Sequence, residues 1–401
     1  MIVGLIFVAT YLVLAFGRLP FFRVDRTSAA VIGAIAVIVA RGLTLDQAYR
    51  AVDYRTLILL FGMMVLVATL RLGTFFRTLG QAVVARVTHP APLLIAVVLM
   101  SGVLSALFVN DTICLVFTPV LIEISAARRQ NPLPFLLALA TASNIGSTAT
   151  ITGNPQNMLI GSMSHIGYAS FAGTLVPVAA FGLAVDALVI YVLFRREFTR
   201  GTGAARRRPP RAIHRIMTTK GLIVAAGMLV GFLAGVDPAL VAASGAAVLL
   251  ITRWVKPEKI YQQVDWSLLM LFVGLFIVVG AVEQAGLDRV FFDWLKPVGV
   301  TTVAGLTVTA ALLSNLISNV PAVMLFTRLV PHLPDPRAGW LALAMASTLA
   351  GNLTLLGSIA NLIVVEGARR EGIRIGFFDY LKVGVPVTLA TLLFGAWWVG
   401  A

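Results

Sequence analysis

Amide and hydroxyl side chains crowd into an apolar segment at residues 136–161, and this stretch is the part of the chain best suited to bind a solute. Its sequence, LLALATASNIGSTATITGNPQNMLIG, begins as an apolar helix and becomes polar part of the way along a membrane-length span. Gly153 and Pro155 interrupt the helix, and the proline frees backbone groups. Broken helices of this kind hold ions in secondary transporters. The alternative is a kinked helix whose Ser and Thr side chains only pack against neighbouring helices.

Similar polar interruptions occur at two Asn-containing tips, residues 109–112 and 318–321, and in a second broken segment at residues 340–368. The candidate binding residues of the first half are Asn110, Asp111, Thr112, Ser143, Asn144, Thr148, Thr150, Gly153, Asn154 and Asn157. Those of the second half are Ser318, Asn319, Ser347, Asn352, Thr354, Gly357, Ser358 and Asn361. Amides, hydroxyls and open carbonyls suit a small hard cation or an oxyanion, and half-helix N-termini favour an anion.

Two acidic residues are candidates for proton coupling. Asp111 lies at the tip between two apolar arms, where a carboxylate is costly and therefore functional by default. A buried carboxyl takes up a proton readily, so Asp111 can act as a proton carrier. Alternatively, it caps the second arm of the hairpin. Asp186 lies within an apolar span, where it is either a second proton site or a hydrogen-bonding partner of a neighbouring helix.

The composition identifies an integral membrane protein with many helices. Of the 401 residues 59% are hydrophobic and 12% charged, with a mean hydropathy of +0.94, whereas soluble domains carry about 25% charged residues. Residues 1–16 are apolar without a basic n-region, which favours a first span over a removed signal. The net charge of +14 fits basic cytoplasmic loops better than nucleic-acid binding.

Motifs for catalysis or cofactor binding are missing from the sequence. No His/Cys grouping has zinc spacing, and neither a phosphate loop nor a nucleophile elbow occurs. We therefore expect no enzyme activity, no cofactor and no bound metal.

Three blocks of the first half recur in the second half in the same order. Residues 52–54 match 264–266, residues 104–118 match 313–327, and residues 137–157 match 341–361. Polar positions recur together with apolar ones, which shared composition alone does not explain. We therefore divide the chain into a first repeat at residues 1–194, a basic linker at residues 195–220 and a second repeat at residues 221–401.

The distribution of positive charge predicts the topology. If each Asn-tipped segment is a re-entrant hairpin, each repeat crosses the membrane five times, and the odd number inverts the second repeat. The basic segments then share one side, which is cytoplasmic: residues 18–26, 71–86, 128–129, 195–220, 253–259 and 369–374. The predicted fold is an all-α polytopic inner-membrane protein of two inverted-topology repeats of five transmembrane helices, each with a re-entrant hairpin and a broken helix. Both termini lie outside.

At these same residues the chain resembles the ion transporter superfamily over essentially its whole length. Residues 109–119 resemble the Asn-Asp hairpin of arsenite permeases, and residues 144–157 are similar to the break of arsenite permease-like and anion permease-like members. Symporters of the superfamily carry a Ser-Asn-Thr tip in both repeats. Residues 109–111 and 318–320 depart from it, which favours proton over sodium coupling. The resemblance implies a homodimer whose hairpins and broken helices move as an elevator against a scaffold.

These observations predict a secondary transporter that uses protons to export arsenite, antimonite or a similar small inorganic solute through the lipid bilayer. A sodium-coupled symporter of a divalent anion or dicarboxylate is the first alternative. A passive anion channel is a second, although a channel requires a continuous polar pore, which two clusters behind hairpins do not suggest. A membrane enzyme lacks a nucleophile–base pair.

Overall fold

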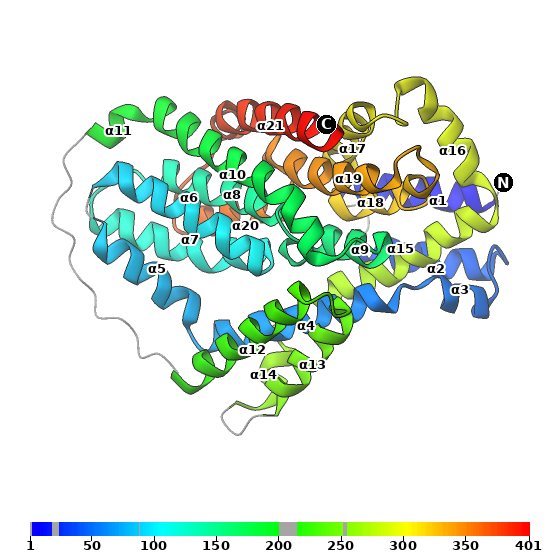
Figure 1. Ribbon diagram of the computed structural model, residues 1–401, viewed down its shortest axis with the longest axis horizontal. Coiled ribbons are helices and arrows are strands. Elements are labelled where there is room, and N and C mark those ends of the chain that lie inside the picture. Colours follow the sequence, from blue (N-terminus) through cyan, green and yellow to red (C-terminus); the bar gives the residue numbers. More distant parts are fainter. Residues whose placement is uncertain (1, 18–23, 88, 200–214, 252–254) are drawn as a thin grey trace.

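The computed structural model describes residues 2–17, 24–87, 89–199, 215–251 and 255–401, and within these ranges every regular element is a helix (Figure 1). The α-helices of the first half are α1 (Ile2–Phe16), α2 (Arg26–Val39), α3 (Leu45–Ala51), α4 (Tyr54–Leu72), α5 (Phe75–Arg86), α6 (Pro90–Leu107), α7 (Asn110–Ala127), α8 (Leu133–Ser147), α9 (Pro155–Ser164), α10 (Tyr168–Leu193) and α11 (Arg195–Thr199). A short 3-10 turn, η1 (Ile151–Gly153), separates α8 from α9.

The second half repeats this order. Its α-helices are α12 (Arg215–Leu233), α13 (Pro238–Leu250), α14 (Pro257–Tyr261), α15 (Trp266–Gln284), α16 (Leu287–Leu295), α17 (Val303–Ile317), α18 (Asn319–Phe326), α19 (Pro336–Leu349), α20 (Ile359–Arg370) and α21 (Phe377–Gly400). Three 3-10 turns accompany them: η2 (Lys296–Val298), η3 (Val330–His332) and η4 (Ala350–Asn352). Apart from α11, each α-helix of the first half therefore has a counterpart in the second half: α6 and α7 correspond to α17 and α18, and α8 and α9 correspond to α19 and α20.

Residues at matching positions of the two repeats cap the N-termini of matching helices. Asp53 is the N-cap of α4, where its carboxylate accepts from the Arg55 amide at 3.1 Å, and Asp265 caps α15 through the Leu268 amide at 2.9 Å. The breaks are also capped alike, because Asn154 accepts from the Asn157 amide and Ser358 accepts from the Ala360 amide. Such caps satisfy backbone donors that the first turn leaves unpaired.

The fourth helix of each half packs against the second helix of the other half. Helix α4 packs against α13 of the other half, and α15 packs against α2 in the same way. A glycine allows each close approach, because a Cβ on Gly62 would stand 2.6 Å from the Ala242 carbonyl oxygen and one on Gly274 would stand 2.7 Å from that of Ala30. Helices α10 and α21 pack against each other (Figure 1). The predicted internal repeat is therefore visible in the tertiary packing.

Seven described helices are long and apolar enough to cross a membrane: α4, α6, α7, α10, α12, α15 and α21. Four shorter apolar helices, α1, α2, α8 and α13, accompany them. The structure thus confirms the predicted fold class, an all-α polytopic membrane protein of two inverted repeats that each contain a helical hairpin and a broken helix.

The predicted linker is described only at its ends. Residues 195–199 form α11, residues 215–220 begin α12, and the basic run from Arg206 to Pro210 lies outside the described residues. Residues 18–23 and Arg253, which belong to two of the predicted basic loops, lie outside them as well.

Candidate functional site

The two broken helices cross each other, and Asn144 near the end of α8 joins them. Its side-chain oxygen accepts from the Asn110 amide at 2.9 Å and from the Ser358 hydroxyl at 3.0 Å. Its amide donates to the side-chain oxygens of Asn352 at 2.8 Å and Asn361 at 3.0 Å. One buried side chain therefore links the first hairpin tip to the break of the opposite repeat.

Thr348 occupies the matching position in α19 and reaches into the first break. The amides of Asn154 and Gln156 each donate to its hydroxyl at 3.2 Å. The Thr348 hydroxyl lies 3.4 Å from the Asn157 side-chain oxygen. Each repeat thus contributes one residue of its helix to the break of the other, which ties the two breaks together as a single polar cluster.

Two further asparagines satisfy the backbone carbonyls that the breaks release. The Asn157 amide donates to the carbonyls of Ser147 at 3.1 Å and Thr150 at 3.0 Å, and the Asn361 amide donates to those of Gly351 at 2.7 Å and Thr354 at 3.2 Å. Carbonyls buried without partners would cost free energy comparable to a lost hydrogen bond. The breaks are therefore built features with internal partners.

Glycines allow the chain to fold back tightly within each break. A Cβ on Gly153 would stand 2.2 Å from the Ser147 carbonyl oxygen, and one on Gly357 would stand 2.7 Å from the Asn315 side-chain oxygen. Thr150 donates to the Ala106 carbonyl of the first hairpin arm. Thr354 donates to the Asn315 side chain of the second arm at 3.1 Å. Each break is thus fixed to the hairpin of its own repeat.

The second hairpin tip has a strained backbone and an acceptor without a hydrogen-bond partner. Ser318 has a φ of 79°, in the left-handed region that a residue with a side chain rarely adopts, and such outliers are typical of functional sites. The side-chain oxygen of Asn319 has no hydrogen-bond partner among the described residues, and its amide lies near Gly351. This tip therefore offers an unused acceptor beside the second break.

The length of the hairpin arms bears on how deeply they enter the membrane. Helix α18 covers only Asn319–Phe326, about 12 Å, against a hydrocarbon core of about 30 Å. In contrast, α6 and α7 have 18 residues each and pass the length test for a span.

Some predicted site residues remain outside the cluster. Thr112 makes no hydrogen bond to it among the described residues, and the Ser347 hydroxyl donates within its own helix, to the Ala344 carbonyl at 3.3 Å. Ser143 contacts the buried Cys114 at 3.0 Å, and the Thr148 hydroxyl donates to the Asn144 carbonyl. Four contributors were absent from the predicted site: Ser147, Asn315, Thr348 and Gln156. Asn315, a lone amide in an apolar arm, was a signal that the sequence offered.

Neither predicted acid belongs to the Asn144 cluster. Asp111 is the second residue of α7 and is partly exposed, and α7 begins without a side-chain cap, so the alternative of an N-cap role for Asp111 is not seen. Asp186 is completely buried in α10. Both positions place a carboxyl near the cluster without making it part of the hydrogen-bond network.

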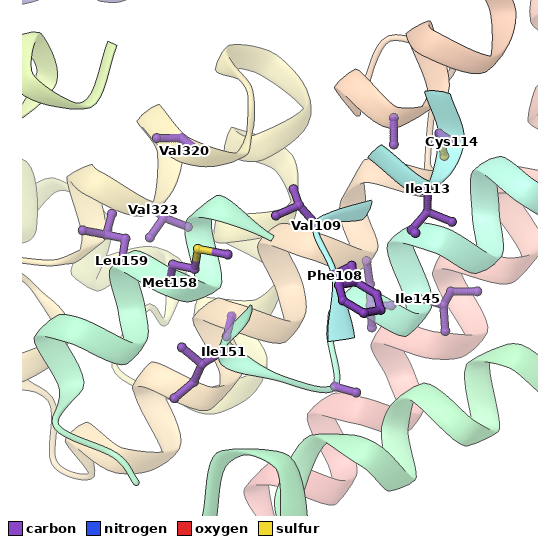
Figure 2. Close-up of a cluster of buried hydrophobic side chains, with 14 of the residues drawn as sticks. Phe108, Val109, Ile113, Cys114, Ile145, Ile151, Met158, Leu159, Val320 and Val323 are labelled. Atoms are coloured by element: carbon purple, nitrogen blue, oxygen red, sulfur yellow. The ribbon is translucent and has the colours of Figure 1, made fainter. Parts of the chain in front are cut away.

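The cluster is electrically neutral and surrounded by apolar side chains. Among the described residues its hydrogen bonds come from amides, hydroxyls and backbone carbonyls, and no group of three or more His, Cys, Asp or Glu side chains could hold a metal ion. Figure 2 shows Phe108 and Val109 at the first hairpin, Met158 in α9, and Val320 and Val323 in α18 packed around the region. An apolar surround strengthens hydrogen bonds and penalises unpartnered polar groups.

Thr348→Val is expected to destabilise the fold, because it leaves the Gln156 amide without an acceptor and removes one of the acceptors of the Asn154 amide, which keeps its bonds to Ser147. Unsatisfied buried donors cost about 1–3 kcal/mol each. Thr309→Val is the matched control, since that hydroxyl only donates to the Gly305 carbonyl of its own helix at 2.7 Å. Thermal unfolding of the purified proteins in detergent measures both. Equal midpoints for the two variants would contradict the role given to Thr348.

Comparison with known proteins gives consistent matches. The model of the family described as citrate transporter, CitMHS, matches residues 11–350. The silicon efflux transporter LSI3 of Oryza sativa subsp. japonica is 32% identical over 96% of this chain and 94% of its own length. The transporter Rv2684 of Mycobacterium tuberculosis is 31% identical, covering 98% of this chain and 96% of its own. A Dictyostelium discoideum protein named as a transporter, arsB, is 23% identical over 98% of this chain and 90% of its own length.

A solved structure is similar over the whole chain. The crystal structure of the YdaH transporter of Alcanivorax borkumensis, described as having an unusual topology, superposes with a TM-score of 0.62 at 16% identity, over 100% of this chain and 98% of that one. At this identity the match supports the fold alone.

Proposed function

The chain belongs to the citrate transporter family CitMHS, within the ion transporter superfamily, and from this premise we propose that it exports a small, neutral, hydroxylated inorganic solute in exchange for protons. The family and the relatives are transporters, which supports the prediction that the chain is not an enzyme. Arsenite, antimonite and silicic acid are the candidate solutes.

The composition of the Asn144 cluster is the observation that carries the choice of solute. Its amides and hydroxyls both donate and accept hydrogen bonds, as the hydroxyl groups of arsenous, antimonous and silicic acid do. An anion would favour a cationic side chain, yet no described Lys or Arg side chain hydrogen-bonds to the cluster. The printed names of two relatives, a silicon efflux transporter and arsB, point to the same class of solute.

The transport mechanism that we propose is an elevator. The first group of helices, α1–α4 with α12–α15, packs mainly within itself, with α4 against α13 and α2 against α15. The second group holds both hairpins, both breaks, α10 and α21. Direct links between the groups include the Tyr11 hydroxyl with the Pro321 carbonyl at 3.3 Å and the Arg328–Glu283 ion pair at 3.0 Å. The second group moves as the transport domain, and the first is the scaffold and the contact surface of a homodimer.

We assign the basic segments to the cytoplasmic side of the inner membrane and both termini to the outside, following the positive-inside rule. Both hairpins are re-entrant in this arrangement. The short α18 supports this for the second hairpin, whereas α6 and α7 of the first hairpin are each long enough to span. A groove of about 320 Å³ lies between α7 and α20, lined by Glu366 and Arg370 at one end and Ile359 near the other. Its described lining does not include the residues of the Asn144 cluster.

Transport in proteoliposomes tests the solute and the coupling ion together. Vesicles loaded with arsenite, antimonite or silicic acid are expected to release the solute faster when the outside is acidified. A protonophore should abolish this stimulation, and replacement of sodium by potassium should leave it unchanged. Vesicles that contain the Asn144→Ala variant are the control for leakage.

A sodium-coupled symporter of a carboxylate anion, either a dicarboxylate or the tricarboxylate citrate, is the second candidate, because the matching family is described as a citrate transporter. The same vesicles decide between the two. Uptake of citrate or succinate that requires sodium, without release of the neutral acids, would overturn the proposed function.

A further inference from the structure

Asp186 is a buried carboxyl group whose oxygens have no partner. The residue is 0% exposed within the continuous helix α10, which packs against α8 and α21. Neither of its side-chain oxygens has a hydrogen-bond partner among the described residues. Removing an unpaired charge from water costs several kcal/mol, so such a group is neutralised by a proton or a cation.

The hydroxyl group of Thr141 explains why Asp186 would be protonated. Thr141 of α8 lies within reach of Asp186, but its hydroxyl proton is donated to the Leu137 carbonyl at 2.8 Å. Only the acceptor lone pairs of Thr141 remain, and an ionised carboxylate has nothing to donate to them. A protonated Asp186 can donate to the Thr141 hydroxyl, which gives both side chains a further hydrogen-bond partner.

Two hydroxyl groups of α21 without partners lie on the side of Asp186. A Cβ on Gly182, one turn before Asp186, would stand 3.0 Å from Thr391 of α21, so α21 passes Asp186 about one turn before Thr391, where Thr388 has an unpartnered hydroxyl. The Tyr380 hydroxyl is also buried without a partner and lies within electrostatic range of Asp186. The phenol is within reach of Asn361 as well. Tyr380 therefore stands between Asp186 and the Asn144 cluster.

Helix α21 also touches the second break directly. A Cβ on Gly384, one turn after Tyr380, would stand 2.3 Å from the Asn352 carbonyl oxygen. A change at Asp186 that shifts α21 would therefore also move Asn352. The side-chain oxygen of Asn352 accepts from the Asn144 amide at 2.8 Å.

The acid and the phenol break the symmetry of the two repeats. Helices α10 and α21 match through Pro177 and Pro386, an offset that places Gly395 opposite Asp186 and Phe171 opposite Tyr380. The matching positions of the other repeat therefore carry no polar side chain, and the fold of a repeat does not require one there. A role in packing alone does not account for them.

Other titratable groups on the neighbouring described helices form no hydrogen bond to Asp186. Helices α6 and α8 carry none. Charged groups on the remaining described helices around α10 are Arg195, Arg196 and Glu197 of α11, Arg215 and Lys220 of α12, Arg337 of α19, and Asp379 and Lys382 of α21. Of these, Lys220 donates to the Leu249 and Ile251 carbonyls, Arg337 to Ser170, and Lys382 to Asp379. Cys114 of α7 acts electrostatically on Tyr380.

We propose that Asp186, Tyr380 and Thr388 form a second site, separate from the Asn144 cluster, which binds a proton and reports its occupancy to Asn361 through Tyr380. A metal ion is disfavoured, because α10 and α21 are unbroken here and their carbonyls are engaged in helical bonds, which leaves few free oxygen ligands. Tyr380 acts as a positioning residue. The proton site itself is independent of the solute, whereas its coupling role rests on the proposed function.

Infrared difference spectroscopy of the purified protein tests the proton site without any solute. The parent protein is expected to show a carboxyl C=O band, additional to those of Asp111 and the other carboxyl groups, that titrates between acid and alkaline pH and is missing in Asp186→Asn. Asp379→Asn, an exposed carboxyl of α21 paired with Lys382 at 3.2 Å, is the matched control and should keep the band. Tyr380→Phe should keep the band but shift its frequency, which a purely structural phenol would not do.

Exchange and net transport in vesicles separate the coupling role from the solute assignment. Asp186→Asn is expected to keep exchange of unlabelled for labelled arsenite and to move fewer protons per arsenite during net efflux. An unchanged infrared spectrum in Asp186→Asn would overturn the proton site. Loss of exchange together with net efflux, or an unchanged proton ratio, would overturn the coupling role. If the parent protein moves no arsenite, the proposed function fails. The infrared result then still decides whether Asp186 binds a proton.

Discussion

Asp111→Asn is expected to reduce proton-driven efflux by roughly 5- to 150-fold, the range of typical coupling free energies between two sites. Asp111 lies in the first turn of α7, next to Asn110, which donates to Asn144. Among the described residues no Lys or Arg forms an ion pair with it, and the charged group that acts on it is another acid, Asp265. Asparagine has nearly the same shape but carries no exchangeable charge. The variant should therefore bind solute and lose the response to a pH gradient.

Efflux from proteoliposomes with and without an acid exterior measures this loss. Asp46→Asn is the matched control, because that exposed carboxyl only pairs with Arg50 one turn away at 3.0 Å. Asp111→Glu keeps a titratable group and should retain part of the stimulation. Full stimulation of Asp111→Asn by the pH gradient would remove Asp111 from the mechanism and leave Asp186 as the remaining acid.

Asn144→Ala is expected to abolish transport and to lower the free energy of unfolding by about 3 kcal/mol, at the upper end for a single substitution. The substitution removes four hydrogen bonds at once and leaves Asn110, Ser358, Asn352 and Asn361 each lacking one. The connection between the first hairpin tip and the second break depends on this side chain. Both the geometry of the site and the attachment of the hairpin should suffer.

Thermal unfolding in detergent and vesicle efflux together check this expectation. Asn131→Ala is the matched control, since its side chain only accepts from the Leu133 amide at 3.1 Å on an exposed surface. Asn144→Thr should be intermediate, because threonine stands at the matching position 348 and can replace part of the network. Transport by Asn144→Ala at the parent rate would show that the solute binds elsewhere.

Periodicity and local chemistry were sufficient to predict most of the elements. The predicted break between residues 133 and 165 is the α8–η1–α9 segment, and the second, predicted from Trp340, begins four residues earlier, at Pro336. Gly153 and Pro155 made the first break visible, since both disfavour a continuous helix. The tips at Asn110 and Asn319 were found in the same way. Local signals of this kind act through the backbone of a few residues and need no knowledge of the fold.

The partners of each side chain could not be predicted in the same way. Thr348 appeared to be an ordinary hydroxyl in an apolar helix, yet it accepts from residues almost two hundred positions away. Ser347 beside it appeared equally suitable and instead bonds within its own helix. On a helix one residue step rotates a side chain by about 100°, so which of two neighbours faces the other repeat depends on how the repeats pack.

The sequence by itself determined the class of this protein, its internal duplication and the segments that interrupt its helices, because hydropathy, repetition and helix-breaking residues are properties of the chain. Only the tertiary structure decided that the two breaks interlock through Asn144 and Thr348, and that Asp186 lies within electrostatic range of Tyr380 in the opposite repeat. These contacts join residues that are distant in sequence, and their geometry follows from the packing of two inverted halves against each other.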